Sequence, residues 1–157
     1  MTDVIIREFA PGDENAFRQL NEEWISRYFV LEAKDLESLR DPKEAILDNG
    51  GRIFFAVLGD RIVGCCALLA MGRGEFEVAK MAVTEAAQGC GIGRRLLGAV
   101  VTVAHEAGAK RLYLETNRRL APAIRLYESL GFQHLPPERI VPSAYARAEV
   151  YMELICA

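Results

Sequence analysis

The chain has 157 residues with a formal net charge of -3, and 51% of its residues are hydrophobic and 26% are charged. This length and composition exclude a disordered chain and favour a single folded domain over residues 1–157. The acidic balance argues against nucleic acid as a partner, because bulk electrostatic binding to phosphates needs a basic surface.

Membrane and metal functions have little support in the sequence. No apolar run reaches the roughly 18 residues that a membrane span requires, and the first residues lack the pattern of a signal peptide, so we expect no membrane partner. No CxxC pair and no cluster with histidine is formed by the cysteines, which are Cys65, Cys66, Cys90 and Cys156. We therefore expect reduced thiols in a cytoplasmic protein, and no bound metal.

Hydrophobic periodicity in the first half of the chain predicts helices followed by a run of strands. The expected elements, in chain order, are a strand over 4–9, an amphipathic helix that begins after Asp13, a helix over 36–47, and strands over 52–58, 61–71 and 75–83. The last three strands are separated by the turn signals Gly59-Asp60 and Gly72-Arg73-Gly74, which predict an antiparallel meander.

After Val83 the pattern changes to alternating helices and strands. The expected elements are a loop over 84–93, a helix that Gly108 closes, a strand over 110–116, a helix over 120–130, a short strand from Phe132 and a final strand over 147–155. The whole order is β-α-α-β-β-β-α-β-α-β-β, which indicates one α/β domain with a mixed sheet.

The loop before the helix of the second half is rich in glycine. Residues 88–94 read Gln-Gly-Cys-Gly-Ile-Gly-Arg and lie between a strand and a helix N-terminus, where free N–H groups and the helix dipole favour anions. Glycines lack the Cβ atoms that would hold a phosphate at a distance, so we expect a phosphate or pyrophosphate site. A Walker loop is excluded because Arg94-Arg95 follows Gly93, and a Rossmann fingerprint would need a third glycine at position 94.

The spacing Gln88-x-x-Gly91-x-Gly93 resembles the acetyl-CoA pyrophosphate loop of the GNAT acetyltransferase superfamily. The segments 77–83, 112–117 and 123–132 are also similar to that family. The resemblance implies a single mixed, mostly antiparallel sheet with a central splayed parallel strand pair flanked by helices. It also implies an N-acetyltransferase that moves acetyl from acetyl-CoA to a primary amine by direct attack in a ternary complex. The alternatives are a non-catalytic CoA-binding sensor on the same fold and an enzyme for another phosphate ligand.

The resemblance assigns a set of residues to acetyl-CoA. These residues are Met81, Ala82, Val83, Gln88, Gly89, Cys90, Gly91, Ile92, Gly93, Arg94, Asn117 and Tyr127. Backbone groups of 81–83 would pair with the pantetheine arm, and backbone N–H groups of 88–94 would hold the pyrophosphate. Tyr127 matches the family tyrosine near the thioester sulfur, where it would protonate the departing thiolate.

The base that frees the acceptor amine is assigned to Glu77, at the position where several branches of the family carry a catalytic glutamate. The pKa of an ordinary glutamate is about six units below that of an alkylamine, so Glu77 needs a raised pKa or an ordered water. Alternatively, the proton leaves after attack, when the nitrogen is far more acidic. The alternative role for Glu77 is a structural carboxylate paired with Lys80 or an arginine. Glu75 shares its strand face and is the second candidate.

The same resemblance places the acceptor pocket between the first helices and the loop before the last strand. It nominates Tyr28, Phe29, Glu32, Glu75, Tyr145 and Arg147. Trp24 is expected in the core, and Glu32 would favour a cationic acceptor, as would the acidic balance of the chain. Small amines, amino acids and protein amines all stay open as acceptors, and residues 136–155 are a candidate surface for a homodimer.

Overall fold

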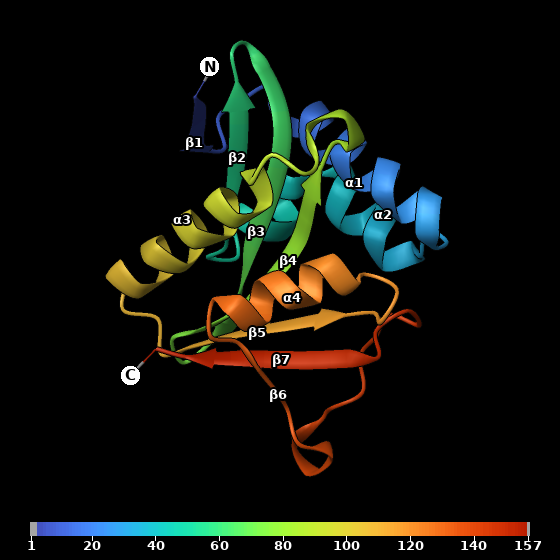
Figure 1. Ribbon diagram of the computed structural model, residues 1–157, viewed down its shortest axis with the longest axis vertical. Helices are drawn as coiled ribbons and strands as arrows, with labels where there is room; N and C mark the ends of the chain where they lie inside the picture. The colour runs from blue at the N-terminus through green and yellow to red at the C-terminus, as the bar shows by residue number, and fades with distance from the viewer. Residues whose placement is uncertain (1–2, 157) are drawn as a thin grey trace.

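The computed structural model describes residues 3–156 and contains one seven-stranded sheet of order β1-β2-β3-β4-β5-β7-β6 (Figure 1). Its strands are β1 (Val4–Glu8), β2 (Arg52–Leu58), β3 (Arg61–Gly72), β4 (Glu75–Val83), β5 (Arg111–Thr116), β6 (Gln133–His134) and β7 (Val150–Ile155). Its helices are α1 (Glu14–Tyr28), α2 (Ala33–Arg40), α3 (Ile92–Glu106) and α4 (Ala121–Ser129), with helical turns η1 (Lys43–Leu47), η2 (Glu85–Ala87) and η3 (Pro137–Arg139).

This architecture confirms the predicted fold class and element order. All neighbouring strands pair antiparallel except β4 and β5, which are parallel. Within residues 3–156, no helix combines the length and the apolar character needed to cross a membrane.

Two predicted boundaries were wrong. The helix expected over 36–47 is split into α2 and the turn η1, because Pro42 lacks the N–H that would continue the helix. The last strand starts at Val150, after a loop in which Arg147 turns toward α2 and hydrogen-bonds Asp35.

The two faces of the sheet carry separate hydrophobic clusters. One face is covered by α3 and α4, and its cluster includes Phe54, Leu97 and Tyr127. The other face is covered by α1 and α2, and its cluster includes Phe17 and Leu39. Because both faces are packed, the residues of the central strands are buried from both sides.

The parallel pair β4–β5 separates after three residue pairs. Glu75 pairs with Arg111, Phe76 with Leu112, and Glu77 with Tyr113, and no further pair joins the two strands. Beyond this point the ribbons diverge (Figure 1). The predicted splay of the central strands is therefore confirmed, and it begins at Glu77.

A bulge interrupts β4 just beyond the splay point. Lys80 has a φ of 55°, in the left-handed region, and the pairing of β3 with β4 shifts register there. Val78 consequently packs on the α3 side, whereas Ala82, four residues later, packs on the α1 side. The bulge thus turns the strand over, since residues four apart in a regular strand share one face.

Candidate active site

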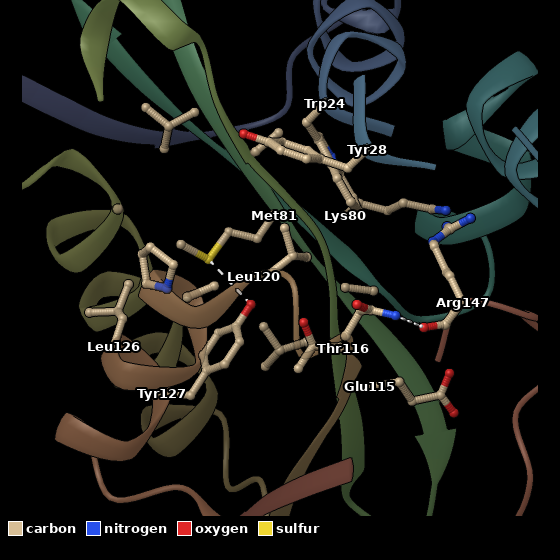
Figure 2. Close-up of a pocket in the computed structure, with 18 of the residues that line it drawn as sticks. Trp24, Tyr28, Lys80, Met81, Glu115, Thr116, Leu120, Leu126, Tyr127 and Arg147 are labelled. Atoms are coloured by element: carbon tan, nitrogen blue, oxygen red, sulfur yellow. Dashed lines mark hydrogen bonds between the residues drawn. The ribbon is translucent and has the colours of Figure 1, made fainter. Parts of the chain in front are cut away.

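A cavity with a volume of about 800 Å³ lies where β4 and β5 separate. It is lined by the end of α1, by β4, the glycine loop, the end of β5, α4 and residues 143–148. All the residues predicted to bind acetyl-CoA line it except Cys90 and Arg94, and Figure 2 shows part of this lining. A cavity between splayed strands gives a ligand access to backbone groups that a continuous sheet would pair.

The glycine loop borders one end of this cavity. Gly89 and Gly91 have φ values of 82° and 76°, which side chains rarely adopt, and Gly91 caps the N-terminus of α3. A Cβ atom on Gly93 would lie 3.3 Å from Cε of Met81, so the loop approaches the cavity wall closely. Left-handed glycines and the N-terminus of a 15-residue helix fit a pyrophosphate group.

The other loop residues hold this segment in place. The Gln88 side-chain amide donates to the carbonyl oxygen of Val83 over 3.0 Å, and the Arg94 guanidinium donates to Oγ of Ser129 in α4 over 2.7 Å. The side chain of Ile92 is buried in the core beneath α3. Cys90, within the loop, is exposed.

Tyr127 extends from α4 into the cavity. Its hydroxyl points at Sδ of Met81, 3.9 Å away (Figure 2). Its ring packs edge-on against Phe132. Burial raises the pKa of the Tyr127 phenol above its ordinary value of 10, so the hydroxyl keeps its proton at neutral pH. Tyr127 can therefore donate a proton inside the cavity.

Glu77 lies at the last paired position of β4 and lines the same cavity. Its side chain forms no hydrogen bond or ion pair with any residue of 3–156, so the alternative role as a partner of Lys80 or an arginine is wrong. Burial and, next, the negative charge of Glu115 raise the pKa of Glu77 to about 7. The carboxyl can thus exchange a proton near neutral pH.

Glu115 is a cavity residue that the sequence did not single out. One of its oxygens accepts from the Tyr113 hydroxyl over 2.9 Å, and the other accepts from Oγ of Ser143 over 2.5 Å. It sits two residues after Tyr113 and so projects from the same face of β5. The alternation of side chains along β5 could have indicated Glu115 as a residue of the site. Its contact with Ser143 could not be predicted in this way, because Ser143 lies in a distant loop.

A buried ion-pair network borders the acceptor side of the cavity. Asp35 of α2 has no exposed surface, and it accepts from Nζ of Lys80 at 3.0 Å and from the Arg147 guanidinium at 2.6 and 2.8 Å. Burial alone would raise the pKa of Asp35, but the hydrogen bonds from Arg147 and the charge of Lys80 bring it down to about 2. Burial lowers the pKa of Lys80, and Asp35 opposes that change. Neither Asp35 nor this function of Lys80 is evident from the sequence, because the two residues meet only in the folded chain.

The predicted acceptor residues divide into two groups. Tyr28, Phe29, Tyr145 and Arg147 line the cavity, and Trp24, expected in the core, lines it too. Glu32 and Glu75 lie outside the lining. Glu32 accepts from the Ala146 amide at 3.1 Å and contacts Arg147 at 3.4 Å, whereas Glu75 pairs with Arg111 at 2.9 Å.

Asn117 and Arg119 tie the end of β5 to its surroundings. The Asn117 amide donates to the Arg147 carbonyl oxygen over 2.8 Å and accepts from the Arg119 backbone over 2.9 Å. The Arg119 guanidinium donates to the Tyr28 carbonyl oxygen over 2.6 Å and packs over the Phe29 ring. Arg119 therefore links the β5 half of the sheet to α1 across the cavity.

Comparison with known proteins identifies the family. The model of the acetyltransferase (GNAT) family matches residues 17–132. The uncharacterized N-acetyltransferase YsnE of Bacillus subtilis is 31% identical over 109 residues, which are 68% of this chain and 68% of the relative. Two further relatives match over only 21% and 35% of their own length.

Solved structures show the same fold. A GNAT-family acetyltransferase from Staphylococcus aureus superposes with a TM-score of 0.88 at 18% identity, covering 99% of this chain and 100% of that one. The acetyltransferase yncA from Salmonella typhimurium, solved with acetyl-CoA, has a TM-score of 0.78 at 20% identity, covering 98% and 94%. The chain belongs to the acetyltransferase (GNAT) family, which confirms the predicted resemblance and with it the class of enzyme, an N-acetyltransferase.

Proposed function

We propose that this chain moves the acetyl group of acetyl-CoA to a primary amine by direct attack within a ternary complex. One observation carries the proposal: a cavity bordered by the glycine loop contains both the Glu77 carboxyl, which has no partner among residues 3–156, and the buried Tyr127 hydroxyl. The first can accept a proton from the amine, and the second can donate one to the departing sulfur.

The donor would lie along β4 and the glycine loop. Backbone groups of residues 81–83 are the proposed partners of the pantetheine arm, since β5 leaves this stretch of β4 unpaired. The proposed pyrophosphate site is the N-terminus of α3 with Gly89 and Gly91. No positively charged surface is needed, because a few aimed backbone dipoles hold the anion.

The raised pKa of Glu77 makes it a competent base. An alkylammonium has a pKa of about 10, so transfer to a carboxylate of ordinary pKa costs about 8 kcal/mol, whereas transfer to a group with a pKa of about 7 costs about 4 kcal/mol. The amine nitrogen then attacks the thioester carbonyl carbon and the C–S bond breaks. Of the two protons that the ammonium loses, one leaves through Glu77 and the other replaces the proton that Tyr127 gives to the thiolate.

A thiol-release assay tests the proposal. The protein is mixed with acetyl-CoA and a panel of primary amines, and free CoA thiol is measured together with acetyl-CoA binding by calorimetry. We expect binding of acetyl-CoA and thiol release that depends on the amine. Binding without release for any amine would favour the CoA sensor instead, and absence of binding would refute both functions.

The homodimer proposed through residues 136–155 is a separate matter. Its test is the molar mass in solution, measured by light scattering with and without acetyl-CoA.

A further inference from the structure

Two cations stand side by side on the acceptor wall of the cavity. Lys80 and Arg147 both line it, and Figure 2 shows the Lys80 ammonium and the Arg147 guanidinium pointing toward one another. The Lys80 residue is only 9% exposed. The Tyr145 ring covers both groups, with its centroid 4.6 Å from Cζ of Arg147 and 5.1 Å from Nζ of Lys80. A surface that holds a buried ammonium beside a half-buried guanidinium is built at a cost in solvation.

The carboxylates that offset these cations lie behind the wall. Asp35 is fully buried and Glu32 bonds the Ala146 backbone, and neither belongs to the cavity lining. Lys34 adds a third cation to the lining and forms no ion pair within residues 3–156. Asp35 and Glu32 therefore lie outside the lining, whereas Lys34, Lys80 and Arg147 face the cavity together with the carboxyls of Glu77 and Glu115.

Lys80 has a hydrogen-bond donor to spare. An ammonium carries three N–H donors. One reaches Asp35 at 3.0 Å and a second reaches the Tyr145 hydroxyl at 3.4 Å. The third has no acceptor among residues 3–156, and an unmet donor of a buried charge favours binding of an anionic oxygen.

Glu77 lies on the same side of β4 as Lys80. Before the bulge, Phe76 and Val78 face α3, so Glu77 faces the opposite side, where Lys80 reaches Asp35 of α2. The two charges are near enough that each shifts the pKa of the other. A proton acceptor and a cation thus stand next to each other at the acceptor end.

Building on the proposed function, we propose that the acceptor is a primary amine with a carboxylate a few bonds from its nitrogen, such as a free α-amino acid. The amine lies at Glu77 and the carboxylate is held by Lys80 and Arg147. Apolar contacts from Trp24, Tyr28 and Phe29 face the rest of the molecule. This replaces the expectation of a cationic acceptor, because Glu32, the residue that suggested it, is already bonded to Arg147 and to the Ala146 backbone outside the lining.

The test compares acceptors that differ only in the carboxylate. The wild-type protein is assayed with phenylalanine, phenethylamine and phenylalaninamide, and with the corresponding leucine series, at one pH and saturating acetyl-CoA. We expect kcat/KM for the amino acids to exceed that for the decarboxylated amines by about tenfold to a hundredfold, the range expected of a charge-assisted hydrogen bond. The amides have a lower amine pKa than the amino acids, so a larger fraction of their amine is unprotonated and able to attack. Because this difference favours the amides, a higher kcat/KM for the amino acids is stringent support for the carboxylate site.

A substitution then assigns the effect to the wall. In Lys80→Gln the ratio of kcat/KM between amino acid and decarboxylated amine should fall at least about fivefold, whereas Lys43→Gln, an exposed lysine paired with Asp48, should keep the wild-type ratio. If Lys80→Gln does not fold, the wild-type comparison still decides.

The outcomes separate the two proposals. If kcat/KM of the wild-type protein for the amino acids is no higher than for the decarboxylated amines, the carboxylate site is overturned, whereas the proposed acetyl transfer stands. An unchanged ratio in folded Lys80→Gln also overturns it. Binding of acetyl-CoA with no thiol release from any amine overturns the proposed function and this inference with it.

Discussion

Replacing Glu77 with glutamine should lower activity and at the same time raise stability above neutral pH. The pKa of Glu77 is raised from 4.5 to about 7, because burial and Glu115 disfavour its charged form. Between these two values the unfolded chain has released the proton and the folded chain still binds it, so wild-type stability falls as pH rises. Once the pH is above 7, the full loss is about 3 kcal/mol, since one pKa unit corresponds to about 1.4 kcal/mol.

The Glu77→Gln protein carries no titrating group at this position and should escape that loss. Denaturant midpoints of both proteins, measured from pH 5 to pH 8.5, give the difference in unfolding free energy at each pH. We expect the difference to move in favour of Glu77→Gln by about 2 to 3 kcal/mol across this range, whatever its value at pH 5. Glu37 is exposed, so Glu37→Gln is the control. Its unfolding free energy should vary with pH in the same way as that of the wild type.

Two results would refute this reasoning. Parallel stability curves for wild type and Glu77→Gln would mean that the Glu77 carboxyl has an ordinary pKa in the folded protein. A stability difference that develops as expected, accompanied by full activity at every pH, would mean that the group is buried but takes no part in catalysis.

Two further outcomes concern other parts of the site. Tyr127→Phe should lower kcat about a hundredfold, as expected for loss of a general acid, without changing the Kd of acetyl-CoA in calorimetry; unchanged kcat would remove Tyr127 from the mechanism. Asp35→Asn should lower the unfolding free energy at pH 7 by about 3 to 5 kcal/mol, because Lys80 and Arg147 then share a neutral partner, whereas exposed Asp41→Asn should lose far less. Since the pKa of Asp35 is about 2, the wild-type protein should keep the stabilisation from ionised Asp35 above pH 4 and lose it as the pH falls toward 2. A similar loss of unfolding free energy in Asp35→Asn and Asp41→Asn would contradict the ion-pair network.

The sequence could predict those parts of the site that depend on neighbours in the chain. The glycine loop, the α3 N-terminus after it and Tyr127 on the following helix are local patterns, and the order of elements follows from periodicity. These patterns were enough for the fold class and for the donor end of the cavity.

The acceptor end depends on contacts between distant segments. Asp35 meets Lys80 across 45 residues and Arg147 across 112 residues, and no local pattern reports such a pairing. Glu32 looked like a ligand for a cation because its sequence neighbours do not reveal that Arg147 folds back onto it. The pKa of Glu77 likewise depends on burial and on Glu115, both set by the closed fold.

The bulge at Lys80 has a consequence for how this segment tolerates change. The residue at position 80 has two roles: it is the extra residue of the bulge, and its positive charge pairs with Asp35. Glycine would adopt a φ of 55° without strain and so could form the bulge, but it has no charge to pair with Asp35. Loss of the residue altogether would remove the bulge and leave a regular strand, in which Met81 and Val83 keep the α3 side and Ala82 keeps the α1 side. The donor wall would be inverted only if the strand were straightened with position 80 retained, because Met81 and Val83 would then exchange faces with Ala82. The bulge therefore adds a cation to the acceptor side of β4 without changing which of its residues face the donor.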